Sequence, residues 1–208
     1  MIERKCPSCG AMVPFRSSIS LLSVCPFCRS LVQRKDLDLE TLGESAQLQP
    51  DGSPVLVGAR GVYRGAPFDV VGRMQLRTPR GFWNEWFLVF ADGRQGWLGE
   101  AQGTYAVSFK AEAAVPALGD LAIGSKVEIQ GRSYEVREIV DAEYLAAEGE
   151  LPFKPPLGEI APSADLIGED GAFATIDYSE TPAVVFAGEY QGFEALAFSG
   201  LKAIEGWA

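Results

Sequence analysis

Histidine is missing from the 208 residues of the chain. It is the commonest general base near neutral pH and the usual partner of serine and cysteine nucleophiles. Its absence excludes Ser-His-Asp and Cys-His catalytic sites, imidazole bases and every metal site that needs a histidine ligand. No other residues form a recognisable catalytic constellation, so the sequence predicts a protein that is not an enzyme.

Long hydrophobic runs are also missing. No stretch approaches the ~18 consecutive apolar residues of a transmembrane helix. The N-terminus, MIERKCPSCG, has neither the apolar core nor the cleavage site of a signal peptide. We therefore expect a cytoplasmic protein without a transmembrane segment. In that reducing compartment, paired CxxC motifs favour metal binding over disulfides.

Positive charge is scarce and unevenly placed. The chain has 18 basic and 28 acidic residues, which gives a net charge of −10. Residues 1–35 reverse this balance, with six basic residues and one acidic residue. An acidic body repels nucleic acid and anionic membranes, so only this basic segment has the charge to contact a phosphate backbone. Because aromatic residues are sparse there, docking of a protein or plain stability is the favoured role.

The four cysteines form two CxxC pairs, at Cys6, Cys9, Cys25 and Cys28. Each CxxC turn points two thiolates to one side, and a hairpin brings both pairs around a tetrahedral ion. Gly10 can adopt the positive φ that such a turn needs. A closed set of four thiolates predicts one structural zinc per chain, with an iron electron-transfer site and a redox dithiol as alternatives.

A short cysteine-rich segment cannot bury enough core to fold alone. Metal binding therefore supplies the missing free energy, on the order of 10 kcal/mol or more. We expect loss of the metal to unfold this segment and to leave the rest of the chain largely intact.

Composition divides the chain into a zinc ribbon (1–35), an acidic linker (36–53), a first β-unit (54–117) and a second β-unit (118–208). Beyond the linker, short runs of Val, Tyr, Phe and Trp are broken by Gly, Pro or Asp-Gly, as in strands joined by hairpins.

An internal repeat relates the two β-units. VGARGVYRGAPFDVVGRM (57–74) aligns without gaps on IGSKVEIQGRSYEVREIV (123–140). Glycines, an aromatic residue and a valine recur at equal offsets, which predicts the same strand, turn and strand in both copies. The predicted fold class is therefore mainly β, a small zinc ribbon followed by two related small β-barrel-like units.

Trp83 and Glu85 are the candidate binding residues of the β-units. Strand alternation places Trp86 on the face opposite Glu85, and Trp86 and Trp97 suit a buried core. Trp83 and Glu85 lie at the loop-proximal end of the strand and offer an aromatic surface beside a carboxylate. This pair suits a cation such as a polyamine, or an Arg or Lys of a partner protein. A purely structural role for the whole group is the alternative.

The acidic residues of the last third match no EF-hand spacing. They are Asp165, Glu169, Asp170 and Asp177. We interpret them as solvated surface and turn residues, with Asp170-Gly171 as a turn before the next strand.

Several segments resemble the domain-of-unknown-function 4178 family. They are GFWNEWFLVFADGRQGWLGEAQG (81–103) and GEDGAFATIDYSETPAVVFAGEYQGFEALAFSGLK (168–202). The resemblance covers about residues 52–203, and its best marker is the W-x-E-[WY]-x-L segment at 83–88 followed by Gly-Trp-Leu at 96–98. In many members a CxxC module precedes the domain, as here. The family has no established activity and supplies no catalytic residue. Its members are bacterial, and their encoding near small membrane proteins and membrane-stress proteins implies an envelope-related complex.

Together these features predict a non-enzymatic adaptor that binds a protein partner through its zinc ribbon and exposed strand edges. The alternative is a sensor whose β-units bind a small cation such as a polyamine. The identity of a partner and the oligomeric state have no signature in the sequence.

Overall fold

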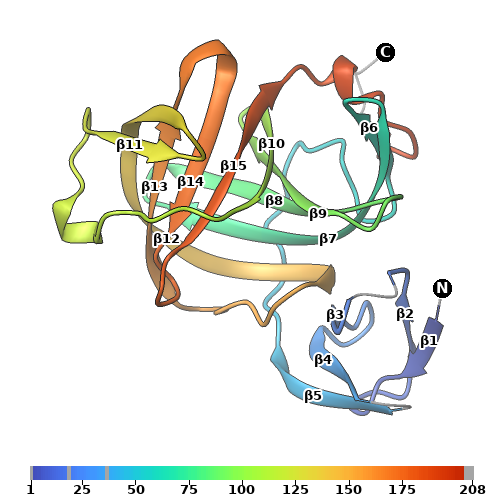
Figure 1. Ribbon diagram of the computed structural model, residues 1–208. Helices are drawn as coiled ribbons and strands as arrows, with labels where there is room; N and C mark the ends of the chain where they lie inside the picture. Colours follow the sequence, from blue (N-terminus) through green and yellow to red (C-terminus); the bar gives the residue numbers. More distant parts are fainter. Residues whose placement is uncertain (1, 18–19, 36–37, 204–208) are drawn as a thin grey trace.

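The computed structural model describes residues 2–17, 20–35 and 38–203. Within these residues the chain is mainly β, and its strands form two sheets (Figure 1). The small sheet pairs β1 (Ile2–Lys5) with β2 (Met12–Phe15). The large sheet contains β3 (Leu22–Val24), β4 (Ser30–Lys35), β5 (Asp38–Glu44), β6 (Arg60–Tyr63), β7 (Ala66–Thr78), β8 (Gly81–Phe90), β9 (Gln95–Ala101), β10 (Thr104–Ala111), β11 (Lys126–Ile129), β12 (Arg132–Leu151), β13 (Ile160–Ile167), β14 (Ala172–Asp177) and β15 (Val184–Gln191).

Eight strands of the large sheet close into a ring of hydrogen bonds. Their order is β7-β8-β9-β10-β15-β14-β13-β12, and β12 pairs with β7 to complete it. The ring is not a regular barrel, because β12 is 20 residues long and continues past the ring to pair with β3. The predicted mainly-β fold class is confirmed.

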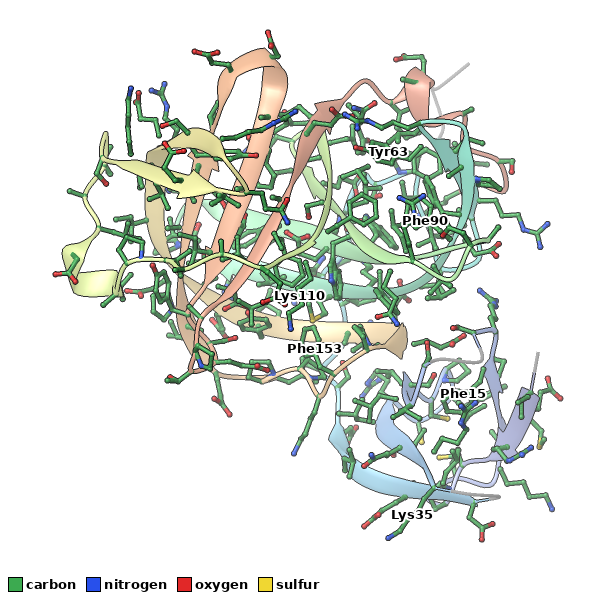
Figure 2. The ribbon with its side chains drawn as sticks, in the orientation of Figure 1. Phe15, Lys35, Tyr63, Phe90, Lys110 and Phe153 are labelled. Atoms are coloured by element: carbon green, nitrogen blue, oxygen red, sulfur yellow. The ribbon has the colours of Figure 1, made fainter. Side chains whose placement is uncertain are left out.

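The two predicted β-units contribute equally to this eight-stranded ring. Strands β7 to β10 come from the first unit and β12 to β15 from the second. Each unit also has its own buried apolar cluster, around Tyr63 and Phe90 in the first and around Leu166 and Ile176 in the second. The Tyr63 and Phe90 side chains lie 6.4 Å apart between centroids (Figure 2). Leu196, near the C-terminus, packs back onto the first cluster.

The predicted repeat is confirmed in the turns of two hairpins. The β6–β7 hairpin turns at Arg64 and Gly65, with φ of 49° and 77°. The β11–β12 hairpin turns at Gln130 and Gly131, with φ of 51° and 76°. Two successive residues with positive φ are typical of a type I′ turn, whose twist matches that of the flanking strands.

The repeat extends into the long strands that follow. The Gly58 N–H donates to the Val70 carbonyl at 2.7 Å, and the Gly124 N–H donates to the Val136 carbonyl at 2.8 Å. A β-bulge then follows Val70 in β7 and Val136 in β12, at the same offset from the turn. A bulge re-aims the side chains beyond it, so both units curve in the same way where they form the ring.

The segment predicted as an acidic linker, 36–53, is attached to the ring. It includes β5, which pairs with β4. The Ser45 hydroxyl donates to the Ala147 carbonyl at 2.9 Å and accepts the Ala147 N–H at 2.8 Å. The Gln49 N–H donates to Gln75 Oε1 at 2.7 Å. The described part of the segment, 38–53, is therefore held against β12 of the second unit and β7 of the first, while the four domain boundaries stay predictions.

Candidate functional site

The four cysteines near the N-terminus lie together. All four sulfur atoms lie within 4.8 Å of one another, and the Cys6–Cys28 and Cys9–Cys25 sulfur pairs are 3.7 Å apart. A tetrahedral ion with Zn–S bonds of ~2.3 Å needs sulfur atoms about 3.8 Å apart. Among the described residues, this is the one group of three or more Cys, His, Asp or Glu side chains close enough to hold a metal ion. The residues present therefore fit a metal with four thiolate ligands.

Two matching turns position these cysteines. In each turn the residue after the second cysteine donates its N–H to the carbonyl of the first, at 2.9 Å. That residue is Gly10 in one turn and Arg29 in the other, with φ of 77° and 60°. The left-handed conformation is thus required by the turn, even where the residue is not glycine. Hydrogen bonds with Ser30 lower the pKa of Cys28 to about 6, whereas burial raises the pKa of Cys25. The four thiols therefore differ in how readily they ionise before a metal binds.

The basic charge of the residues around these cysteines, 2–35, which we call the cysteine module, is partly compensated by β5. Lys35 approaches Glu40 at 3.5 Å, and Arg29 approaches Glu44 at 3.6 Å. Exposed pairs of this kind add little stability, but they offset the positive charge on which a phosphate contact would depend.

The eight-stranded ring contains a cavity of about 590 Å³. Every strand of the ring contributes lining side chains. Small residues at inward positions keep it open, among them Gly99, Ala106, Ser108, Ala142, Ala161 and Ser163. Aromatic side chains supply much of the wall, among them Trp83, Trp97, Tyr144, Phe153, Phe186 and Tyr190. A cavity of this size and lining suits a small molecule.

Five acidic residues line this cavity, of which Glu138 pairs with Arg80 and Glu100 accepts a hydrogen bond from the Trp86 indole N–H. The other three come from different strands. Glu85 lies on β8, Asp165 on β13 and Asp177 on β14. Among the described lining residues Arg80 is the one basic side chain, and it forms an ion pair with Glu138. The cavity therefore carries an excess of negative charge with no protein cation assigned to the three inner acids.

Side chains of the wall fix two of these carboxylates. Trp83 donates its indole N–H to Glu85 Oε1 at 3.0 Å. The Thr175 hydroxyl donates to Asp165 Oδ1 at 2.5 Å, across the β13–β14 pair. Each acid therefore has one oxygen held against the wall of the cavity.

Burial raises the pKa of two of the cavity acids. Burial, and after it the charges of Asp165 and Asp177, raises the pKa of Glu85 to about 8, against the opposing hydrogen bond from Trp83. Burial also raises the pKa of Asp165, against the hydrogen bond from Thr175. The ionised forms are unfavourable in this setting, and a cation placed beside them would stabilise them.

The structure brings the two candidate binding residues together. Trp83 and Glu85 are hydrogen-bonded neighbours, and they face the cavity rather than an outer surface of the protein. Trp86 lies on the opposite face of β8, in the buried cluster of the first unit, as alternation predicts. Trp97 is also buried, in the cluster between the two units, and lines the cavity.

The expectation that Asp165 and Asp177 are solvated surface residues is wrong, because both line the cavity. Asp170 and Gly171 do form the expected turn, with φ of 54° and 75°. Polar positions alternate with buried apolar positions along β13 and β14. In a sequence, a polar face turned to outer solvent and one turned to an inner cavity show the same alternation, so the signal was present but ambiguous.

The family model described as "Domain of unknown function (DUF4178)" matches residues 56–192. The chain belongs to this family. The matched DUF4178 segment includes every strand of the eight-stranded ring, and the four cysteines precede it. No curated protein and no solved structure matches the chain. Within the described residues, no helix has the length and apolar character needed to cross a membrane.

Proposed function

We propose that the DUF4178 ring of this protein binds a small organic cation in its cavity. The observation that carries the proposal is the Trp83–Glu85 pair, which faces the cavity together with two further carboxylates. A carboxylate beside an aromatic surface attracts a cation by charge and by cation–π contact. The three acids do not gather closely enough to hold one metal ion, which favours an organic cation. A polyamine has suitable charge and an apolar chain for the aromatic wall.

The adaptor hypothesis is a second candidate, supported by the surface of the cysteine module. Phe27 is 71% exposed within the second CxxC turn, and Leu21 and Met12 are 51% and 42% exposed. Exposed apolar side chains mark a protein contact where they form one contiguous patch, which is what this hypothesis requires of these three. On this hypothesis the cysteine module docks a protein partner, while the ring binds the ligand. Neither role includes a catalytic step, and we propose that the protein is not an enzyme.

Zinc is the proposed metal of the cysteine module, one ion per chain. Four thiolates at tetrahedral spacing complete the coordination of zinc and leave no open position for substrate or water, so the ion is structural. Cysteines that must stay reduced to bind metal also favour a reducing compartment such as the cytoplasm.

Spermidine tests the proposed cation binding. We expect it to bind the wild-type chain and to raise its melting temperature, because a ligand that binds only the folded state stabilises it. Glu85→Gln keeps the size of the side chain and removes its charge. It is expected to weaken binding by roughly 10- to 100-fold, as for a lost charge-assisted hydrogen bond. Isothermal titration calorimetry measures this change.

Glu128→Gln is the matched control, because Glu128 is an exposed residue of β11 outside the cavity. This variant is expected to bind spermidine like the wild type. Absence of binding by the wild type, or an equal loss in both variants, would count against a cavity site. An adaptor without a ligand would likewise leave melting unchanged by every cation.

A further inference from the structure

We infer that the cavity binds a linear molecule with a cationic group at each end, one held by Glu85 and the other by Asp165. The inference rests on the proposed function and specifies its ligand as a diammonium chain. Four features of the cavity carry it: the places of the two acids in the ring, their unpaired oxygens, the missing protein cation and the open space between them.

The two acids lie on separate walls of the ring. Glu85 is on β8 and Asp165 is on β13, and the ring order places two strands between β8 and β13 on one side and four on the other. Glu85 belongs to the first unit and Asp165 to the second. A ligand that contacts both must therefore cross the interior of the ring.

Each of these carboxylates has one oxygen occupied and one free. Trp83 occupies Glu85 Oε1, and Thr175 occupies Asp165 Oδ1. Within the described part of the chain, no donor reaches Glu85 Oε2 or Asp165 Oδ2. Both side chains are half-buried in the wall of the cavity, so their free oxygens are accessible from its interior. An ammonium group on the ligand would donate a charge-assisted hydrogen bond to each of them.

The third acid of the cavity already has partners for both oxygens. Asp177 Oδ2 accepts the Tyr144 hydroxyl at 3.2 Å, and Asp177 Oδ1 accepts the Ser179 N–H at 2.8 Å. Asp177 therefore adds negative charge to the cavity without offering a free oxygen. Arg80, the one basic residue among the described lining residues, pairs with Glu138, so it supplies no counter-charge to the inner acids.

The repeat explains the open space between the two ends. By strand register, Ala161 of the second unit occupies the position that Trp83 occupies in the first, and Ser163 occupies the position of Glu85. The second unit thus has small residues where the first has a large aromatic and a carboxylate. This asymmetry leaves room for a chain of methylene groups against the aromatic wall.

Paired amines test the inference with the full chain. Diaminobutane and diaminopentane each have a monoamine of the same length, butylamine and pentylamine. We expect at least one diamine to bind roughly tenfold or more tightly than its monoamine, because the second contact adds to the first without a second association cost. Isothermal titration calorimetry at one pH and ionic strength measures the ratio of the diamine's affinity to that of its monoamine.

Glu85→Gln and Asp165→Asn locate the two ends. Either variant is expected to reduce the diamine-to-monoamine ratio to about one, since only one charged anchor remains. Equal affinities of diamine and monoamine for the wild type would overturn the inference, even if spermidine binding still depended on Glu85 and the proposed function stood. Failure of every amine to bind would instead overturn the proposed function. If Asp165→Asn does not fold, the inference is tested by the ratio of diamine to monoamine affinity in the wild type and in Glu85→Gln.

Discussion

Replacing Cys25 with serine is expected to unfold the cysteine module and also to lower the melting temperature of the DUF4178 ring. Loss of one ligand removes metal binding that contributes on the order of 10 kcal/mol to folding. The effect spreads because β3 pairs with β12, a strand of the ring. Leu22 and Val24 of β3 also belong to the same buried cluster as Trp97 at the cavity wall. Differential scanning calorimetry measures the change.

Phe27→Ser is the matched control, since it changes an exposed residue of the same CxxC turn and no metal ligand. It is expected to keep one zinc per chain and the wild-type melting temperature. Elemental analysis should find one zinc in the wild type and none in Cys25→Ser. An unchanged ring transition after zinc loss would show that the two parts fold independently, and iron with visible absorption would contradict a zinc site.

Gly72→Ala is expected to destabilise the chain by about 3 kcal/mol or more, because β7 and β12 approach closely there. Gly72 pairs with Gly149, and a Cβ built on Gly72 would lie 1.7 Å from the Glu150 carbonyl oxygen. That obstacle is backbone, so the strands themselves must separate. Urea unfolding measures the loss.

Gly99→Ala is the control for this prediction. A Cβ on Gly99 would lie 3.5 Å from Glu85 Oε1, which is an ordinary contact. We expect its effect on the free energy of unfolding to stay below ~1 kcal/mol. Equal losses of stability in both variants would mean that the glycines matter for their backbone freedom. The close approach of β7 and β12 would then not be the cause of the loss.

The sequence predicted those features of the structure that depend on residues close together in the chain. The CxxC spacing identified Cys6, Cys9, Cys25 and Cys28 as one group, and their sulfur atoms do lie together. The repeated glycine pattern identified two matching hairpins because a type I′ turn restricts which residues can occupy it. Sequence also paired Trp83 with Glu85, since two residues apart on a strand lie on one face.

No local pattern in the sequence predicted that the strands close into a ring. It depends on pairing between β7 and β12 and between β10 and β15, segments far apart in the chain. Without that closure, the polar faces of β13 and β14 look like solvent-facing surfaces. Asp165 and Asp177 were therefore missed, and the independence of the cysteine module was expected, because β3 was not known to continue the sheet of the ring.

The pKa of Glu85, measured by carbon-13 NMR with and without diaminobutane, tests the central claim most directly. A carboxyl in the wall of this cavity, beside other acids, should titrate near pH 8 in the ligand-free protein, well above its ordinary range. A cation bound beside it favours the ionised form, so the pKa should fall on saturation and binding near neutral pH should release a proton. A pKa near 4.5 without ligand, or one that diamine binding does not move, would contradict an enclosed cation site at Glu85.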